Sequence, residues 1–261
     1  MSVLRDARFA ARTAALAAYS LATYAGFETE IRIRPGAEDE PLLRHYRRRF
    51  GRHMLKLFGV DVATRGVPER GWVPRADATG RGRLFISNHR SGLDILVTLA
   101  FLEGKHLSRG DLAGWPVIGL LARRSGILFV DRTSRRSSAA AVQSMISTIE
   151  EGTGIILFPE GTTYAGDEVR PFKPGAYAVA KRTGCELVPV GLAYAGGGAS
   201  FEEEEFLAHM RRVAGTKKTR VGLSVGEPLR AASGVDPGTF GELLREAVQA
   251  EVTRARALVG P

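Results

Sequence analysis

Short apolar segments alternate with longer helical segments along most of this chain, and this alternation restricts the fold more than any other feature. Segments typical of buried strands occur near residues 60–65, 83–87, 126–130, 154–158, 186–193 and 219–225. Helices are expected at residues 92–102, 115–123, 136–151, 174–183, 201–213 and 238–258. Because strands that alternate with helices are typical of α/β proteins, we predict an α/β fold with a mixed β-sheet flanked by helices.

The chain begins with arginines followed by an uncharged, alanine-rich stretch, and this pattern predicts a helix with a basic start. Three arginines, Arg5, Arg8 and Arg12, precede an uncharged, alanine-rich stretch at residues 13–27. These fifteen residues are fewer than the roughly 20 that span a bilayer. A signal peptide remains an alternative, although no clear cleavage site follows. We expect this helix to lie in the membrane interface.

A second basic helix is predicted at residues 41–58, where apolar and basic residues recur at helical spacing. Such a helix suits an anionic membrane surface, although its basic residues can also form a solvated face while the apolar stripe packs on the protein. We therefore predict a membrane-associating segment at residues 1–58 and an α/β domain at residues 59–261. The expected location is the cytoplasmic face of the cell membrane, with peripheral or monotopic attachment.

The net charge favours anionic partners. The 261 residues contain 37 Lys and Arg against 28 Asp and Glu, which gives a net charge of +9. Nucleic acid, acidic lipid and phosphorylated substrates all suit such a protein. Aromatic residues are few, and the basic cluster lies beside apolar helices, so a membrane surface is favoured over nucleic acid. A basic protein that binds an anionic surface or nucleic acid without catalysis is the alternative from another class.

Several classes of chemistry lack their motifs here. The single cysteine, Cys185, excludes an intrachain disulfide and fits a reducing compartment. No Cys and His cluster has the spacing of metal ligands, so no metal is expected. The sequence contains no Gly-x-Ser-x-Gly motif of serine hydrolases and no glycine-rich nucleotide loop.

The first polar turn that indicates catalysis is Asn88 to Gly92, between a buried strand and an apolar helix. Ligands of open α/β sheets lie at such strand ends. His89 follows the strand, and Asp94 begins the helix. A carboxylate beside one ring nitrogen fixes the tautomer of a histidine, so the other nitrogen can accept a proton. Capping of the strand and the helix is the structural alternative.

A second polar turn, Pro159 to Thr163, follows the strand near residues 154–158. Gly161 allows the backbone to turn sharply, and the N–H groups of Gly161 and Thr162 are candidates to face an anion. Two strand ends of this kind are expected to form opposite walls of one cleft.

Together, Asn88-His89-x4-Asp94 and Phe158-Pro159-Glu160-Gly161-Thr162 resemble the glycerolipid acyltransferase family, over about residues 84–195. Familiar members acylate 1-acylglycerol-3-phosphate to give phosphatidic acid. The resemblance implies that His89 is the general base, that Asp94 orients it, and that no covalent acyl-enzyme forms. It implies an acyl thioester donor, acyl-CoA or acyl carrier protein, a lysophospholipid acceptor and no cofactor.

The resemblance also implies residues that bind the acceptor head group. A cation on the acceptor's phosphate is expected at Arg132, and Arg109 stands where relatives often carry a lysine. Thr163 departs from the family, which often has arginine there, and this makes an acceptor such as a lyso-ornithine lipid the alternative. The predicted substrate-binding residues are Arg109, Arg132, Glu160, Gly161, Thr162, Thr163 and Lys173.

Overall fold

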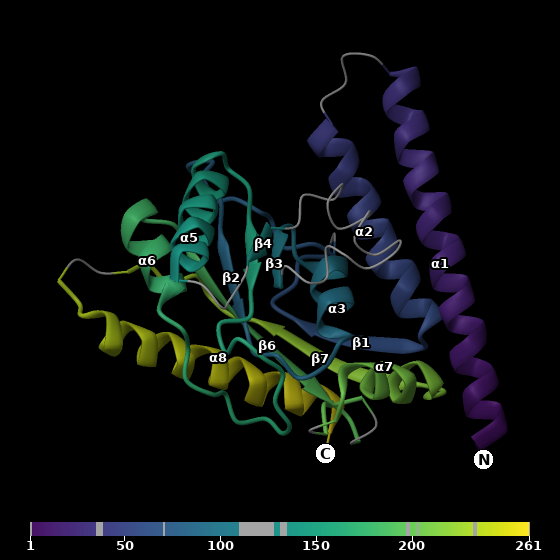
Figure 1. Ribbon diagram of the computed structural model, residues 1–261. Coiled ribbons are helices and arrows are strands. Elements are labelled where there is room, and N and C mark those ends of the chain that lie inside the picture. Colours follow the sequence, from purple (N-terminus) through teal and green to yellow (C-terminus); the bar gives the residue numbers. More distant parts are fainter. Residues whose placement is uncertain are drawn as a thin grey trace.

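A seven-stranded sheet forms the centre of the computed structural model, which describes residues 2–34, 39–69, 71–109, 128–130, 135–196, 199–202, 204–231 and 234–260 (Figure 1). The order across the sheet is β1-β7-β6-β2-β5-β3-β4. The strands are β1 (Val60–Arg65), β2 (Leu84–Ser87), β3 (Lys105–Arg109), β4 (Leu128–Val130), β5 (Ile155–Leu157), β6 (Leu187–Tyr194) and β7 (Thr219–Val225).

The sheet is mixed, as the sequence predicted. Strands β6 and β7 pair antiparallel, whereas the other neighbouring strands pair parallel. Helices cover both faces. They are α1 (Ser2–Ile33), α2 (Asp39–Leu57), α3 (Asp94–Phe101), α5 (Arg135–Glu150), α6 (Gly175–Thr183), α7 (Phe206–Gly215) and α8 (Pro237–Val259).

Two apolar cores lie on opposite faces of the sheet because successive side chains of a strand point to opposite sides. On β2, Phe85 joins the core formed with α2, α3 and α7, whereas Leu84 and Ile86 join the core formed with α5, α6 and α8. All three side chains are fully buried. A strand buried on both faces reads as a continuous apolar run, which is why these strands were predictable.

One strand was not predicted. Strand β3 contains the polar residues Lys105, His106 and Ser108, so it lacks the apolar run expected of a buried strand. His106 is nevertheless buried, and its Nε2 lies 2.8 Å from the Thr98 hydroxyl oxygen of α3. The helix predicted at residues 115–123 lies outside the described residues.

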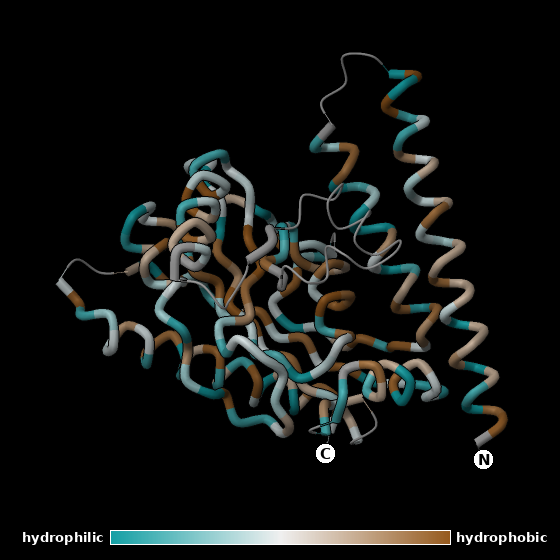
Figure 2. Tube along the Cα trace, viewed as in Figure 1, coloured by the Kyte–Doolittle hydropathy of each residue, from teal (hydrophilic) through white to brown (hydrophobic). Residues whose placement is uncertain are grey.

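The two N-terminal helices run antiparallel to each other along one side of the molecule (Figure 1). Aromatic contacts join them, including Tyr19 with Phe50 at 5.9 Å between ring centroids. Apolar residues recur along α1 (Figure 2), and the large exposed ones are Val3, Leu4, Leu21 and Ile33. No described helix combines the length and apolarity that crossing a membrane requires.

Many of the N-terminal basic residues bind the protein itself. Arg8 and Arg12 donate to the carbonyl oxygens of Gly215 and Ala214 at the end of α7, at 2.7 and 2.9 Å. Arg47 of α2 is buried, and its guanidinium bonds to a carboxylate of the same helix. The basic residues of this segment are therefore only partly available to a membrane surface, and membrane association of residues 1–58 stays a prediction.

Candidate active site

The two polar turns lie side by side because their strands are neighbours. Strands β2 and β5 pair parallel, with Ile86 opposite Leu157, so both strands end at the same edge of the sheet. The backbone N–H of His89 donates to Glu160 Oε2 at 2.7 Å, and the N–H of Tyr164 donates to the His89 carbonyl at 3.0 Å. The two turns are therefore neighbours bonded to each other, and the expectation that they form opposite walls of one cleft stays a prediction.

His89 is paired with Asp94 as the spacing predicted. Nδ1 of His89 lies 2.7 Å from Asp94 Oδ2. Asp94 is the first residue of α3 and is fully buried. The imidazole stacks on Phe158, with ring centroids 4.4 Å apart, and 20% of the His89 side chain is exposed. Among the described residues, Nε2 has no hydrogen-bond partner. This leaves the basic nitrogen available to a hydroxyl group.

Asp94 is held in place by backbone and side-chain donors. The N–H groups of Arg90 and Ser91 donate to Oδ2 at 2.6 and 2.9 Å, and the Tyr194 hydroxyl donates to Oδ1 at 2.5 Å. Burial and the neighbouring carboxylate raise the pKa of Tyr194, so its hydroxyl remains protonated and a donor. A carboxylate fixed in this way selects the tautomer in which His89 carries its proton on Nδ1.

Glu160 has partners within the protein that the sequence did not indicate. The side chain is fully buried and forms a bidentate ion pair with Arg90, at 2.8 and 3.0 Å. It also accepts the N–H groups of His89 and Arg170. The carboxylate is thus bonded within the protein in this arrangement, and contact of Glu160 with the acceptor head group stays a prediction. Glu160 also joins the two turns, so that it positions His89.

Gly161 has a positive φ of 85°, as its place in a sharp turn requires. Its N–H donates to the Phe158 carbonyl at 3.1 Å, so this N–H serves the turn rather than an anion. A side chain at this position would meet the Lys173 ammonium group, which lies over the glycine. Thr162 and Lys173 are exposed and Thr163 is half-buried. Contact of Thr162, Thr163 and Lys173 with a substrate stays a prediction.

Two predicted cations are described only in part or not at all. Arg132 lies outside the described residues. Arg109 ends β3, two strands from β2 and at the same edge of the sheet, although its side chain is also outside the described part. Both therefore stay predictions.

Four side chains at the site had no role assigned from the sequence. Asn88 exchanges two hydrogen bonds with the backbone of Leu192, at 2.8 and 2.9 Å, which ties the first turn to β6. Arg90 of the same turn bonds to Glu160, Tyr194 donates to Asp94, and His209 accepts the N–H of Gly92. Only Asn88 and Arg90 had a signal, since both lie within the motif. Tyr194 and His209 lie 100 and 117 positions farther along the chain than these partners.

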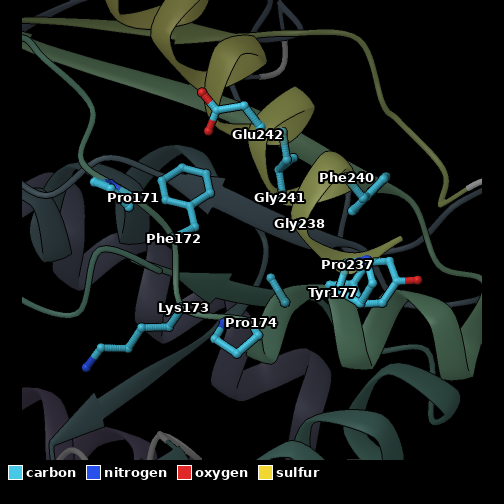
Figure 3. Close-up of a pocket in the computed structure, with 12 residues that line it drawn as sticks. Pro171, Phe172, Lys173, Pro174, Tyr177, Pro237, Gly238, Phe240, Gly241 and Glu242 are labelled. Carbon is cyan, nitrogen blue, oxygen red and sulfur yellow. The ribbon is translucent and has the colours of Figure 1, made fainter. Parts of the chain in front are cut away.

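An aromatic pocket of about 290 Å³ lies near the second turn (Figure 3). Phe172, Tyr177 and Phe240 line it, together with proline residues. Figure 3 shows the Lys173 side chain extending away from these rings. Lys173 thus contributes to the pocket wall, while its ammonium group lies at the turn at Gly161.

Comparisons with known proteins find acyltransferases. A family model described as Acyltransferase matches residues 69–193. A lyso-ornithine lipid O-acyltransferase of Pseudomonas aeruginosa is 28% identical over 256 residues, which are 96% of this chain and 93% of that protein. A 1-acyl-sn-glycerol-3-phosphate acyltransferase of Neisseria gonorrhoeae is 30% identical over 113 residues, 43% of this chain and 44% of that protein.

A solved structure shares the fold. The crystal structure of the 1-acyl-sn-glycerophosphate acyltransferase PlsC from Thermotoga maritima matches with a TM-score of 0.75 and 19% identity, and the match covers 100% of both chains. The matched family region contains the His89–Asp94 pair and the turn at Glu160, which the structure shows bonded to each other. On these grounds residues 69–193 of the chain are similar to the acyltransferase family, and the whole chain shares the fold of the PlsC structure.

Proposed function

We propose that this enzyme transfers a fatty acyl group from a thioester donor to the free hydroxyl of a lysolipid. The observation that carries the proposal is the His89–Asp94 pair, with a protonated Nδ1 held by a buried carboxylate and Nε2 available at the sheet edge. The relatives named above act on lysolipids, which supports this substrate class. Acyl-CoA and acyl carrier protein are both suitable donors.

The proposed reaction needs no covalent acyl-enzyme. His89 Nε2 takes the proton of the acceptor hydroxyl while the oxygen attacks the thioester carbonyl carbon. The carbon–sulfur bond then breaks, and the departing thiolate takes the proton from Nε2, so that His89 returns to its neutral state. Asp94 accepts the Nδ1 hydrogen bond throughout and stabilises the imidazolium that forms between these steps.

The acceptor head group has two candidates. Lys173 and Arg170 are exposed beside the second turn and supply the positive charge that 1-acylglycerol-3-phosphate needs. Thr163, in contrast, adds no charge where the family often has arginine. The relative that aligns with 96% of this chain acts on lyso-ornithine lipid. These two observations make lyso-ornithine lipid the second candidate acceptor.

Residues 1–58 are proposed to attach the enzyme to the cytoplasmic face of the membrane. Helix α1 carries exposed apolar residues at both ends, Val3 and Leu4 near the start and Ile33 at the end. An apolar groove of about 490 Å³ lies between α1 and α2, and alanines, Tyr19, Met54 and Leu57 contribute to its walls. Exposed apolar surface with flanking cations suits shallow insertion among anionic lipids.

An acyl-transfer assay in detergent micelles tests the proposal. Wild-type enzyme is given 1-acylglycerol-3-phosphate, lyso-ornithine lipid and a lysophosphodiester, each with acyl-CoA and with acyl carrier protein. We expect product with at least one lysolipid and loss of product for His89→Ala. His45→Ala is the matched control, because His45 is an exposed histidine of α2 outside the site. Product at the wild-type rate from His89→Ala would contradict the proposal.

A further inference from the structure

A second buried histidine contacts the catalytic turn from the side of α7. His209 is 1% exposed, and its Nε2 accepts the backbone N–H of Gly92 at 3.0 Å. The same nitrogen lies 3.2 Å from the Ser91 hydroxyl oxygen. His209 lies outside residues 69–193, the region of the family match. It has no part in the reaction proposed above.

The hydrogen bonds of the turn show why this contact matters. The N–H groups of Arg90 and Ser91 donate to Asp94, and the N–H of Leu93 donates to the Ser91 hydroxyl at 3.2 Å. The N–H of Gly92 lies between these groups and donates to His209. One side chain from outside the turn thus completes this series of consecutive backbone donors. Without it, a poorly accessible N–H would lack a partner, which natural structures avoid.

The ring of His209 is held in the tautomer that this contact requires. Because Nε2 accepts the Gly92 N–H, the proton of the neutral ring sits on Nδ1, which donates to Glu204 at 3.1 Å. Burial lowers the pKa of His209 and therefore favours the neutral ring. Arg212 bonds to Glu204 and lowers the pKa of that carboxyl, so Glu204 stays ionised as the acceptor.

The position of α7 is restrained near its middle and at its C-terminal end. His209 contacts Gly92, and a side chain added at Gly92 would meet the Met210 sulfur at 2.6 Å, so α7 packs closely on the turn. At the C-terminal end, Arg8 and Arg12 of α1 bond to carbonyls of α7. A helix fixed in this way can hold Nε2 of His209 at a constant distance from the turn.

We propose that His209 is a positioning residue for the His89–Asp94 pair, acting through the backbone N–H of Gly92 and the Ser91 hydroxyl. It holds the turn in which Arg90 and Ser91 present their N–H groups to Asp94, so the carboxylate keeps its place against His89. The proposal rests on the proposed acyl transfer, because its effect on the rate is exerted through the catalytic base. Substrate contact is not part of this role.

Variants at position 209 separate positioning from simple packing. A glutamine amide oxygen reaches the place of Nε2 and can accept the Gly92 N–H, whereas an asparagine amide reaches only as far as Nδ1. Leucine fills space without accepting a hydrogen bond. Leu207→Gln is the control on the same helix, since Leu207 is 70% exposed.

We expect His209→Leu and His209→Asn to lower kcat by about tenfold or more, with little change in KM for the lysolipid, because small displacements of a catalytic group are costly. His209→Gln should restore most of kcat, and Leu207→Gln should behave as wild type. If His209→Leu fails to fold, the comparison of the glutamine and asparagine variants decides. Equal kcat in all folded variants would overturn the proposal.

A spectroscopic measurement keeps the result independent of the proposed function. NMR of isotope-labelled histidine reports the Nδ1 proton of His89 and its hydrogen bond to Asp94 without any substrate. We expect this signal to change in His209→Asn and to return in His209→Gln. If wild type acylates no lysolipid, the proposed acceptor class fails while this signal still judges His209. An unchanged His89 signal in every variant would overturn the positioning role.

Discussion

Two histidines stack on one aromatic ring, Phe158, yet they have different chemistry. His89 stacks on Phe158 at 4.4 Å between centroids, and His106 stacks on the same ring at 6.4 Å. His89 has a carboxylate partner and partial exposure, whereas His106 is buried against the Thr98 hydroxyl. Burial, together with the nearby Arg47 and His89, lowers the pKa of His106 to about 3. The comparison teaches that the partner and the solvent decide which imidazole can act as a base.

The largest expected effect is the loss of activity when His89 is replaced. His89→Ala removes the proton acceptor, and we expect kcat to fall by roughly 100- to 10,000-fold. Asp94→Asn should fall in the same range, because an amide can present its NH2 group to Nδ1 and favour the wrong tautomer. His106→Gln should retain activity within about threefold of wild type, since it touches no substrate in the proposed mechanism. Steady-state acyl transfer measures all three, and a His106→Gln loss as large as that of His89→Ala would refute the assignment.

The second prediction tests whether the buried Glu160–Arg90 ion pair stabilises the two turns beside His89. Glu160→Gln leaves the Arg90 guanidinium buried without a charged partner, which typically costs about 3–5 kcal/mol of unfolding free energy. Urea unfolding followed by circular dichroism measures this loss. The control is Glu242→Gln, which breaks an exposed ion pair with Arg245 and should leave the unfolding midpoint close to wild type. Equal midpoints for the two variants would show that the buried pair does not stabilise the turns.

The third prediction uses acid to sharpen the contrast at His106. Its pKa is lowered to about 3 in the folded protein, so the unfolded chain binds the proton more tightly. The resulting stability is present above the unfolded pKa of roughly 6.5 and is lost as the pH falls toward the folded value. When the pH is lowered from about 7.5 to about 5, the protonation of His106 in the unfolded chain should reduce the unfolding free energy by about 2 kcal/mol.

The glutamine variant isolates this contribution of His106. A glutamine amide keeps a hydrogen-bonding group near Thr98 and does not titrate. The unfolding free energy of His106→Gln should therefore depend less on pH than that of wild type by the same amount. Parallel pH dependence in the two proteins would show that His106 is not kept neutral by the fold.

The smallest expected effect concerns which acceptor lipid the enzyme prefers. Thr163→Arg adds a cation to the second turn, and a charge-assisted contact contributes roughly 1.5–3 kcal/mol. We expect kcat/KM for 1-acylglycerol-3-phosphate to rise about tenfold relative to that for a zwitterionic lysolipid. Leu207→Arg is the control, because Leu207 is an exposed residue of α7 outside the predicted substrate-binding residues. An unchanged ratio for Thr163→Arg would mean that residue 163 does not face the head group.

The sequence by itself determined the elements whose signal is local. The apolar runs of β2 and β5 predicted buried strands, and the turns after them predicted where His89 and Asp94 would lie. The spacing of this pair is local too, because the turn at Gly92 brings the start of α3 back to the strand end. The resemblance to the acyltransferase family followed from the same short motifs, and the family match over residues 69–193 includes them.

Only the tertiary structure decided how those motifs are supported. Nothing in the sequence indicated that the Glu160 carboxylate is buried against Arg90, because this ion pair depends on β2 and β5 being neighbours. Tyr194 and His209 gave no signal, since their partners lie 100 and 117 residues away along the chain. Hydrogen bonds between distant segments depend on strand order and helix packing, and neither has a periodicity that a single sequence displays.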